Sequence, residues 1–329
     1  MPSAYRTLGQ DPGDADLLSL GLDGDRRPAS CVLAPDAWAK WRRTQARTPW
    51  AQTRLREVVL QTGDTLRASA TVHDLPAVLD GQPVTVFSVS HLTAHDGEPA
   101  ESAHRLMDAV IDEATEAGAA AVLLAAVAGD GWTDPLGFVD ATPPTVALRV
   151  LAGRRPGAPM LSVRAGEVTD LPQLVDMADS MPPVRFRLER DLPFIAHTLA
   201  VARLRAGLQP NGQERLEFFV TEEGTRAAAY VVLRIRSDGW RLEQCGDRDP
   251  SGARVGAILQ ALVARDPSAV GPAIHGWLPS GWLPPQLIAT PCAPAPCRTV
   301  VRLLGVAASR PPLAPRDTIM WMADLLQAV

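Results

Sequence analysis

One stretch of the sequence, residues 84–127, constrains the fold more than any other. It joins a β-branched run at 84–89, a polar segment at 90–97, an amphipathic pattern at 99–117 and an apolar run at 119–127. The amphipathic pattern predicts a helix with one buried face, because apolar residues recur at helical spacing; they are Leu106, Met107, Val110, Ile111 and Ala114. Pro99 suits the first position of this helix, and Gly118 suits the left-handed residue that ends it. The stretch therefore predicts a strand, a loop, a helix and a buried strand.

The predicted loop leads into the amino end of the predicted helix. Such a position collects unpaired backbone N–H groups and the positive end of the helix dipole, so it favours phosphate groups. The following apolar run is too short for a membrane span, which needs about 20 residues, and fits a central strand.

Length and charge narrow the class of protein. A chain of 329 residues with 46% hydrophobic and 21% charged residues is typical of a globular protein with two domains. The net charge of -5 argues against a nucleic-acid partner, because phosphate contacts need a basic surface. The chain has only four cysteines and no basic-then-apolar run at its start, so we expect a cytoplasmic protein with no metal site, no disulfide framework and no membrane partner.

A linker composition at residues 152–159, rich in Gly, Pro and Arg, predicts a boundary between domains at 1–152 and 160–329. The second half repeats the order of the first, with helices at 191–205 and 251–264, a hairpin at 217–234 and a last helix at 317–327. In the first half, tryptophans among arginines at 37–50 are interpreted as a packing face of a helix, because an acidic protein does not attract the nucleic acid whose bases they could stack on.

The pattern of residues 84–89, 103–118 and Gly137-Phe138 resembles the core of the GNAT N-acetyltransferases, of the tandem-domain type. The resemblance implies an α/β (α+β) chain of two GNAT-like domains, each a mixed, mostly antiparallel sheet flanked by helices. It also implies acetyl-CoA, or another acyl-CoA, as co-substrate and a small-molecule amine as acceptor. A homodimer is left open.

The sequence departs from the family at the acyl-CoA-binding motif. The family's loop carries Arg or Gln, then Gly, then Gly or Ala, and these positions fall here on Glu98, Glu101 and Ala103, of which only Ala103 matches. The carboxylates would repel a pyrophosphate. Thr133 lies near the position where the family often has a tyrosine that protonates the leaving thiolate.

The expected site residues follow from this alignment. The predicted catalytic residues are His91, His95 and Thr133, and the predicted cofactor-binding residues are Leu92, Thr93, Ala94, Gly97, Ser102 and Ala103. Neutral imidazole can deprotonate an amine, although a surface or capping role is more common for any one histidine. The lead prediction is acyl-CoA-dependent N-acyltransfer. The alternatives are a catalytically degenerate domain that binds a ligand or regulates a partner, and an aminoacyl-tRNA-dependent enzyme, which the acidic charge disfavours.

Overall fold

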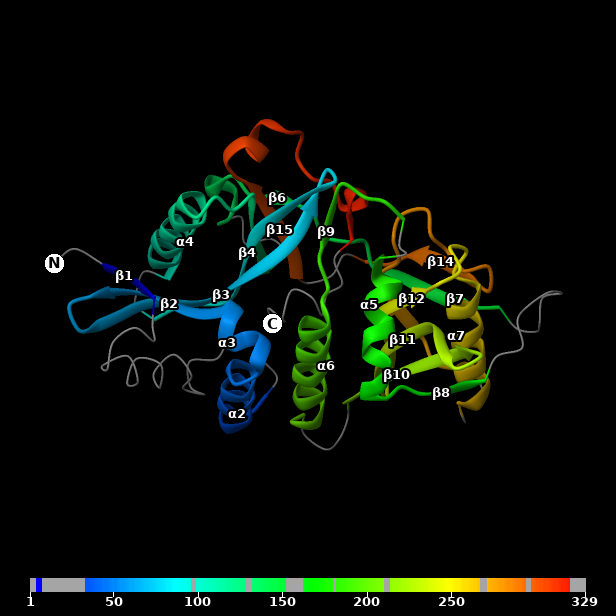
Figure 1. Ribbon diagram of the computed structural model, residues 1–329. Helices are drawn as coiled ribbons and strands as arrows, with labels where there is room; N and C mark the ends of the chain where they lie inside the picture. Colours follow the sequence, from blue (N-terminus) through cyan, green and yellow to red (C-terminus); the bar gives the residue numbers. More distant parts are fainter. Residues whose placement is uncertain are drawn as a thin grey trace.

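The computed structural model describes residues 4–7, 33–95, 99–127, 132–151, 162–179, 182–209, 214–266, 271–293 and 297–319. Two mixed β-sheets lie at opposite ends of the molecule, and helices flank each of them (Figure 1). This confirms the predicted fold class.

The first sheet has nine strands, in the order β1-β2-β3-β4-β5-β15-β6, with β9 pairing with β3 and β16 with β9. Their bounds are β1 Ala4–Thr7, β2 Leu55–Thr62, β3 Thr65–Leu79, β4 Gln82–Ala94, β5 Ala121–Val127, β6 Val139–Asp140, β9 Phe186–Leu188, β15 Cys297–Leu303 and β16 Thr318–Ile319. Most neighbours are antiparallel, but β4 and β5 are parallel, because α4 connects them.

The second sheet has seven strands, in the order β14-β7-β13-β12-β11-β10-β8. Their bounds are β7 Val146–Val150, β8 Val163–Ala165, β10 Glu214–Glu223, β11 Arg226–Arg236, β12 Gly239–Asp247, β13 Ile274–Gly276 and β14 Leu287–Pro291. Here β12 and β13 are the parallel pair, and α7 (Ala253–Arg265) connects them. The two sheets thus repeat one strand-helix-strand unit.

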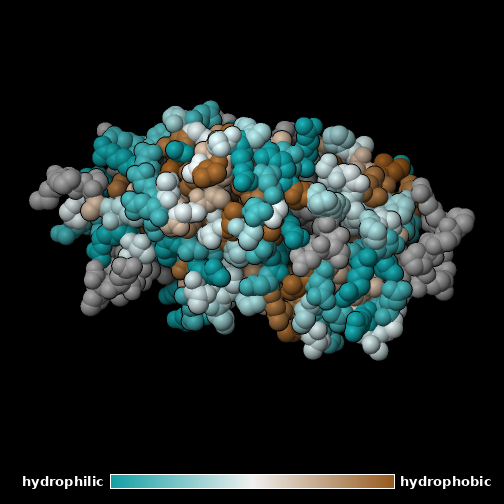
Figure 2. All heavy atoms as spheres, turned by 45° about the horizontal axis from the view of Figure 1, so that its top comes forward, coloured by the Kyte–Doolittle hydropathy of each residue, from teal (hydrophilic) through white to brown (hydrophobic). Residues whose placement is uncertain are grey.

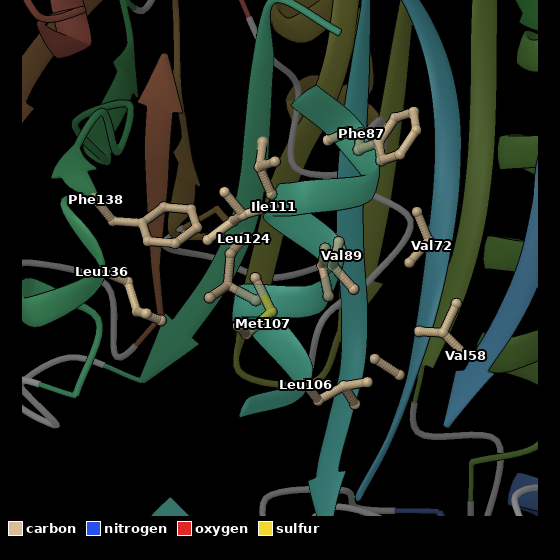
Figure 3. Close-up of a cluster of buried hydrophobic side chains, with 14 of the residues drawn as sticks. Val58, Val72, Phe87, Val89, Leu106, Met107, Ile111, Leu124, Leu136 and Phe138 are labelled. Carbon is tan, nitrogen blue, oxygen red and sulfur yellow. The ribbon is translucent and has the colours of Figure 1, made fainter. Parts of the chain in front are cut away.

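The helix α4 (Pro99–Glu116) covers one face of the first sheet, as its apolar pattern predicts (Figure 1). Leu106, Met107 and Ile111 lie against strand residues such as Val89 and Leu124, and all five are at most 4% exposed (Figure 3). Gly118 has a φ of 71°, which confirms its predicted role as the left-handed residue after the helix.

The opposite face of the first sheet is covered by α2 (Pro35–Ala46), α3 (Pro49–Arg54) and α6 (Leu192–Gly207). The helix α6 comes from the second half of the chain but contacts α2 and α3, and it also contacts α5 (Leu171–Asp179) and β10 of the second sheet. Trp41 Nε1 donates to the Val201 carbonyl at 3.2 Å, which links α2 to α6. Buried on several sides, α6 joins the two units.

Two elements differ from the predictions. The segment Ser90–Ala94, predicted as a loop, continues β4, because it pairs with residues 68–71 of β3. The helix predicted at 317–327 is wrong at Thr318–Ile319, where the chain forms β16 beside β9. Residues 320–327 of this predicted helix lie outside the described part of the chain.

The predicted linker at 152–159 also lies outside the described residues. Strands from each side of it belong to the sheet formed mainly by the other side. The strand β7 precedes the linker but joins the second sheet, and β15 follows it but joins the first. The division at 152 and 160 therefore stays a prediction about domains. The first sheet takes β9, β15 and β16 from the second half of the chain, and the second sheet takes β7 from the first half.

Most of the surface visible in Figure 2 is hydrophilic, and its hydrophobic residues form separated patches. Within the described residues, no helix is both long and apolar enough to cross a membrane.

Candidate functional site

The candidate site lies where two central strands of the first sheet separate. The parallel pairing of β4 and β5 ends at Val89 and Leu124. Beyond this point β4 continues to Ala94 beside β3, and β5 continues to Val127 beside β15. Beyond this point β4 and β5 no longer hydrogen-bond to each other. An extended ligand can therefore hydrogen-bond to the backbone at the edge of one strand.

A β-bulge at this point places His91 on the face covered by α2. The register between β3 and β4 shifts between Ser69 and Thr71, which leaves one extra residue in β4. His91 has a φ of 53°, a left-handed conformation that costs about 1–2 kcal/mol for a residue other than glycine. Its Nδ1 lies 3.0 Å from Ser90 Oγ, whereas the next residue, Leu92, packs against the core beneath α4.

His91 belongs to a buried polar cluster, defined as Arg42, Glu57, Thr71, Ser90 and His91. Arg42 Nη2 lies 2.6 Å from Glu57 Oε1 and 2.6 Å from Thr71 Oγ1. Thr71 Oγ1 lies 3.0 and 3.1 Å from the two oxygens of Glu57, and 3.4 Å from His91 Nδ1. Hydrogen bonds therefore connect a buried ion pair to the histidine at the strand separation.

Two tryptophans of α2 orient the His91 ring. The ring centroid of His91 lies 5.2 Å from Trp38 and 5.4 Å from Trp41, with interplanar angles of 71° and 73°. Trp38 is 5% exposed and Trp41 is fully buried, which agrees with the predicted packing face. Edge-to-face contacts of this kind hold the imidazole plane in one orientation.

A second pair of histidines lies under α3 and α6, on the same face of the sheet. Trp50 lies 4.6 Å from His197 and 6.1 Å from His73, between ring centroids. Burial, with smaller contributions from the neighbouring His197 and Arg42, lowers the pKa of His73 to about 3. Burial alone lowers the pKa of His197 to about 4, so both rings are neutral at physiological pH.

The structure brings some of the predicted site residues together and separates others. His91 joins the polar cluster, whereas His95 Nε2 lies 2.9 Å from Ser69 Oγ. Thr133 is 5% exposed and precedes a short 3₁₀ helix, Asp134–Leu136. Its neighbour Trp132 packs against the same core cluster as Leu92, so the two segments share one core.

The predicted cofactor-binding residues occupy the end of β4 and the start of α4. Leu92, Thr93 and Ala94 are half-buried on β4. Ser102 is 7% exposed and Ala103 is half-buried, both near the start of α4, and Gly97 lies outside the described residues. These assignments stay predictions. Glu101, in the same first turn, pairs with Arg105 on the exposed side of the helix.

In the second sheet, β12 and β13 separate in the same way, but there the carboxylate of Asp247 occupies the amino end of the following helix. The pairing of β12 with β13 ends at Leu242, and the register with β11 shifts next to it. Asp247 then accepts hydrogen bonds from the backbone N–H groups of Arg254 at 2.8 Å and Val255 at 3.2 Å, in the first turn of α7. Burial raises the pKa of Asp247, although these hydrogen bonds act in the opposite direction. A phosphate would have to displace this carboxylate.

The sequence analysis missed Arg42, Glu57 and Thr71. The signal that could have found them is the alternation of Ser69, Thr71 and His73 along a strand, since residues two apart share one face of a sheet. The helices α2, α3 and α6 bury that face.

Comparisons with known proteins identify similar folds. No protein-family model and no curated protein matches the sequence. The similar solved structures include a GCN5-related N-acetyltransferase from Anabaena variabilis, with a TM-score of 0.64 and 12% identity over 93% of this chain and 74% of that one. Another is from Kribbella flavida, with a TM-score of 0.60 and 13% identity over 92% of this chain and 71% of that one. Eis1 from Mycobacterium abscessus has a TM-score of 0.57 and 12% identity over 92% of this chain and 74% of that one. At these identities the likeness concerns the fold alone. The chain therefore has the fold of the GCN5-related N-acetyltransferases over most of its length.

Proposed function

We propose that the chain transfers an acyl group from an acyl-CoA thioester to the amine of a small molecule, at the separation of β4 and β5. One observation carries the proposal: the parallel pairing ends at Val89, directly before a bulge that joins His91 to a buried Arg42–Glu57 ion pair. A strand edge for an extended thioester and a histidine for an amine thus lie in adjacent residues.

Each predicted residue has a role in this reaction. The backbone N–H groups of Leu92, Thr93 and Ala94 hold the pantetheine arm and polarise the thioester carbonyl. Ser102 and Ala103, in the first turn of α4, would contact the phosphates, and Gly97 keeps its predicted role in the loop before the helix. His95, four residues beyond His91 and bonded to Ser69, is the alternative base.

The acyl group passes directly from the sulfur of the thioester to the nitrogen of the amine. The amine nitrogen forms a bond to the carbonyl carbon, and the carbon–sulfur bond breaks with its electron pair going to sulfur. The proton of the amine goes to a loop histidine, His91 or His95, and the thiolate takes a proton from water through the Thr133 hydroxyl. The hydroxide that this leaves takes up the proton held by the histidine. A thiolate needs less help from an acid than an alkoxide does, since the thiol pKa is about 8.5.

A second function, acyl-CoA or ligand binding without transfer, is favoured by the acidic start of α4 and by the tyrosines. The chain has only Tyr5 and Tyr230. Tyr5 donates to Glu113 on α4, and Tyr230 is fully buried in the second sheet, so neither is placed to protonate a thiolate at β4.

Calorimetric titration with acetyl-CoA, combined with a thiol-release assay on a panel of small amines, separates the two functions. Saturable binding with amine-dependent release of free thiol supports acyl transfer. Binding with no release at any amine supports the second function. No binding at millimolar acetyl-CoA contradicts acyl transfer and acyl-CoA binding alike, and leaves only the binding of a different ligand.

The acidic loop gives a sharper test of where the phosphates lie. Replacing Glu98 by Arg and Glu101 by Gly should tighten acetyl-CoA binding by about tenfold, because two carboxylates no longer oppose the pyrophosphate. The matched control is Glu116→Gln at the other, exposed end of α4. Unchanged affinity in the double variant would show that the phosphates bind elsewhere.

A further inference from the structure

We propose that His104 is a positioning residue: by holding the backbone of Trp132 against α4, it sets the place of Thr133 relative to the amino end of that helix. The role of Thr133 in proton transfer rests on the proposed function. The hold on residues 132–138 does not, because it can be measured in the protein alone.

A hydrogen bond joins α4 to the segment that follows β5. His104 Nε2 lies 2.5 Å from the carbonyl oxygen of Trp132. A carbonyl oxygen only accepts, so Nε2 carries a proton and donates. The centroid of the same imidazole ring lies 5.6 Å from that of the Trp132 indole, at an interplanar angle of 47°. His104 therefore contacts both the backbone and the side chain of Trp132.

Arg302 holds the other end of this segment from β15. Its Nη1 donates to the Leu136 carbonyl at 2.7 Å, and the charge of the donor strengthens the hydrogen bond. Between the two anchors the chain forms the 3₁₀ helix Asp134–Leu136, in which the Leu136 N–H donates to the Thr133 carbonyl at 3.2 Å. Thr133 is thus adjacent to one anchored residue and three residues before the other.

The apolar side chains of the segment join the core beneath α4. Leu136 and Phe138 are each 7% exposed and belong to the same cluster as Met107, and Trp132 packs against that cluster (Figure 3). Apolar packing is not directional, so by itself it does not fix where the segment lies along the helix. Hydrogen bonds fix that position, because they need short distances and aligned atoms.

The spacing between Thr133 and α4 matters because one molecule has to reach both places. In the proposed reaction Ser102 and Ala103 contact the phosphates of acyl-CoA, and Thr133 passes a proton to the leaving thiolate. The pantetheine arm joins the phosphates to the sulfur covalently, so it limits their separation. A misplacement of about 1 Å can cost about 100-fold in rate. His104 directly follows Ala103, so it ties the proton donor to the turn that contacts the phosphates.

Hydrogen–deuterium exchange of the full chain tests the hold without any substrate. The N–H groups of Leu136 and Gly137 are hydrogen-bonded within the segment, so their exchange reports its order. His104→Leu removes the donor, and we expect these two amides to exchange about tenfold faster while residues 106–116 of α4 exchange as before. His104→Gln keeps an N–H donor of similar reach and should exchange like the wild type. Equal exchange in His104→Leu and the wild type would overturn the proposal.

Steady-state kinetics test the positioning role. In His104→Leu we expect kcat to fall about tenfold and KM for acetyl-CoA to change by less than about twofold, because proton transfer belongs to the chemical step and the phosphate contacts stay in place. His104→Gln should restore kcat. A kcat of His104→Gln as low as that of His104→Leu would show that the hydrogen bond is not what matters.

Two further variants keep the test independent of a loss of fold. His104→Asn is polar but too short to reach the Trp132 carbonyl, so it should behave as His104→Leu does; if His104→Leu does not fold, the comparison of His104→Asn with His104→Gln makes the same test. The matched control is His275→Leu, at an exposed position of β13 in the second sheet, which should leave exchange and kcat unchanged. Thermal unfolding of each variant shows which of them fold.

The two proposals fail separately. Faster exchange in His104→Leu, in a protein whose wild type acylates no amine, supports the hold and contradicts the proposed function. Acylation by the wild type with unchanged exchange in His104→Leu contradicts the hold and leaves the proposed function standing. Faster exchange with an unchanged kcat contradicts the positioning role, because the place of Thr133 would then not affect the reaction.

Discussion

Arg42 on α2 and Glu57 on β2 form an ion pair at 2.6 Å, with side chains that are 3% and 16% exposed. Removing one partner leaves a buried charge, so Glu57→Leu should lower the free energy of unfolding by about 3–5 kcal/mol. The double variant Arg42→Met with Glu57→Leu should recover part of this loss. Urea unfolding measures both.

The control is an exposed ion pair. Glu101 and Arg105, on α4, are 51% and 57% exposed, and Glu101→Gln should change stability by less than about 1 kcal/mol. An equal loss from Glu57→Leu and Glu101→Gln would contradict the buried nature of the Arg42–Glu57 pair.

Stability should fall in mild acid because of His73 and His197. Their folded pKa values are about 3 and 4, and the unfolded value is about 6.5. The unfolded chain therefore binds protons at a higher pH than the folded chain does, so stability is complete above about pH 7 and is lost as the pH falls below 6.5. At pH 5 we expect a loss of about 2 kcal/mol per histidine relative to pH 8.

Urea unfolding at both pH values measures this loss. His197→Gln removes one of the two titrating groups, so the difference between pH 8 and pH 5 should shrink by about 2 kcal/mol. A difference as large as in the wild type would show that His197 is not buried in its neutral form.

The carboxylate of Asp247 caps α7, and its loss should destabilise the second sheet. Asp247→Ala leaves the first-turn N–H groups of Arg254 and Val255 without their acceptor, which should cost about 2 kcal/mol in chemical unfolding. Asp249→Ala is the comparison, because Asp249 is 38% exposed and accepts from Ser251 at the surface. A smaller cost for Asp247 than for Asp249 would contradict the capping role.

The core beneath α4 should be sensitive to the loss of single side chains. Leu106 is fully buried, and Leu106→Ala should cost about 2–5 kcal/mol by creating a cavity. Val306 is 84% exposed, and Val306→Ala should change stability by less than about 0.5 kcal/mol. Thermal melting of the two variants side by side tests whether α4 is packed as Figure 3 shows.

Local patterns predicted the elements well. The spacing of apolar residues identified α4, and Gly118 marked its end, because a helix depends on residues three and four apart in the chain. The hairpin of β10 and β11 and the helix α7 were found in the same way. The glycines and charges of the loop before α7 gave no hint that Asp247 would fill its first turn, because that contact depends on how the loop folds back.

The extent of β4 shows where local patterns stop. Residues 90–97 are mostly polar and contain His91 and His95, so they were interpreted as a loop. Residues 90–94 form a strand because β3 extends beside them, and the bulge at His91 absorbs the mismatch in register. Pairing between strands, which is a long-range interaction, outweighed the local composition.

The sequence by itself determined a mixed α/β chain with two copies of a strand-helix-strand unit, since those units follow from hydrophobic periodicity within short segments. Only the tertiary structure decided that β7 and β15 change sheets, that α6 joins both units, and that Arg42, Glu57, Thr71 and His91 meet on one buried face. These residues come from four separate elements. Their contacts depend on strand order and on which helix covers which face, and both are set by burial across the whole chain.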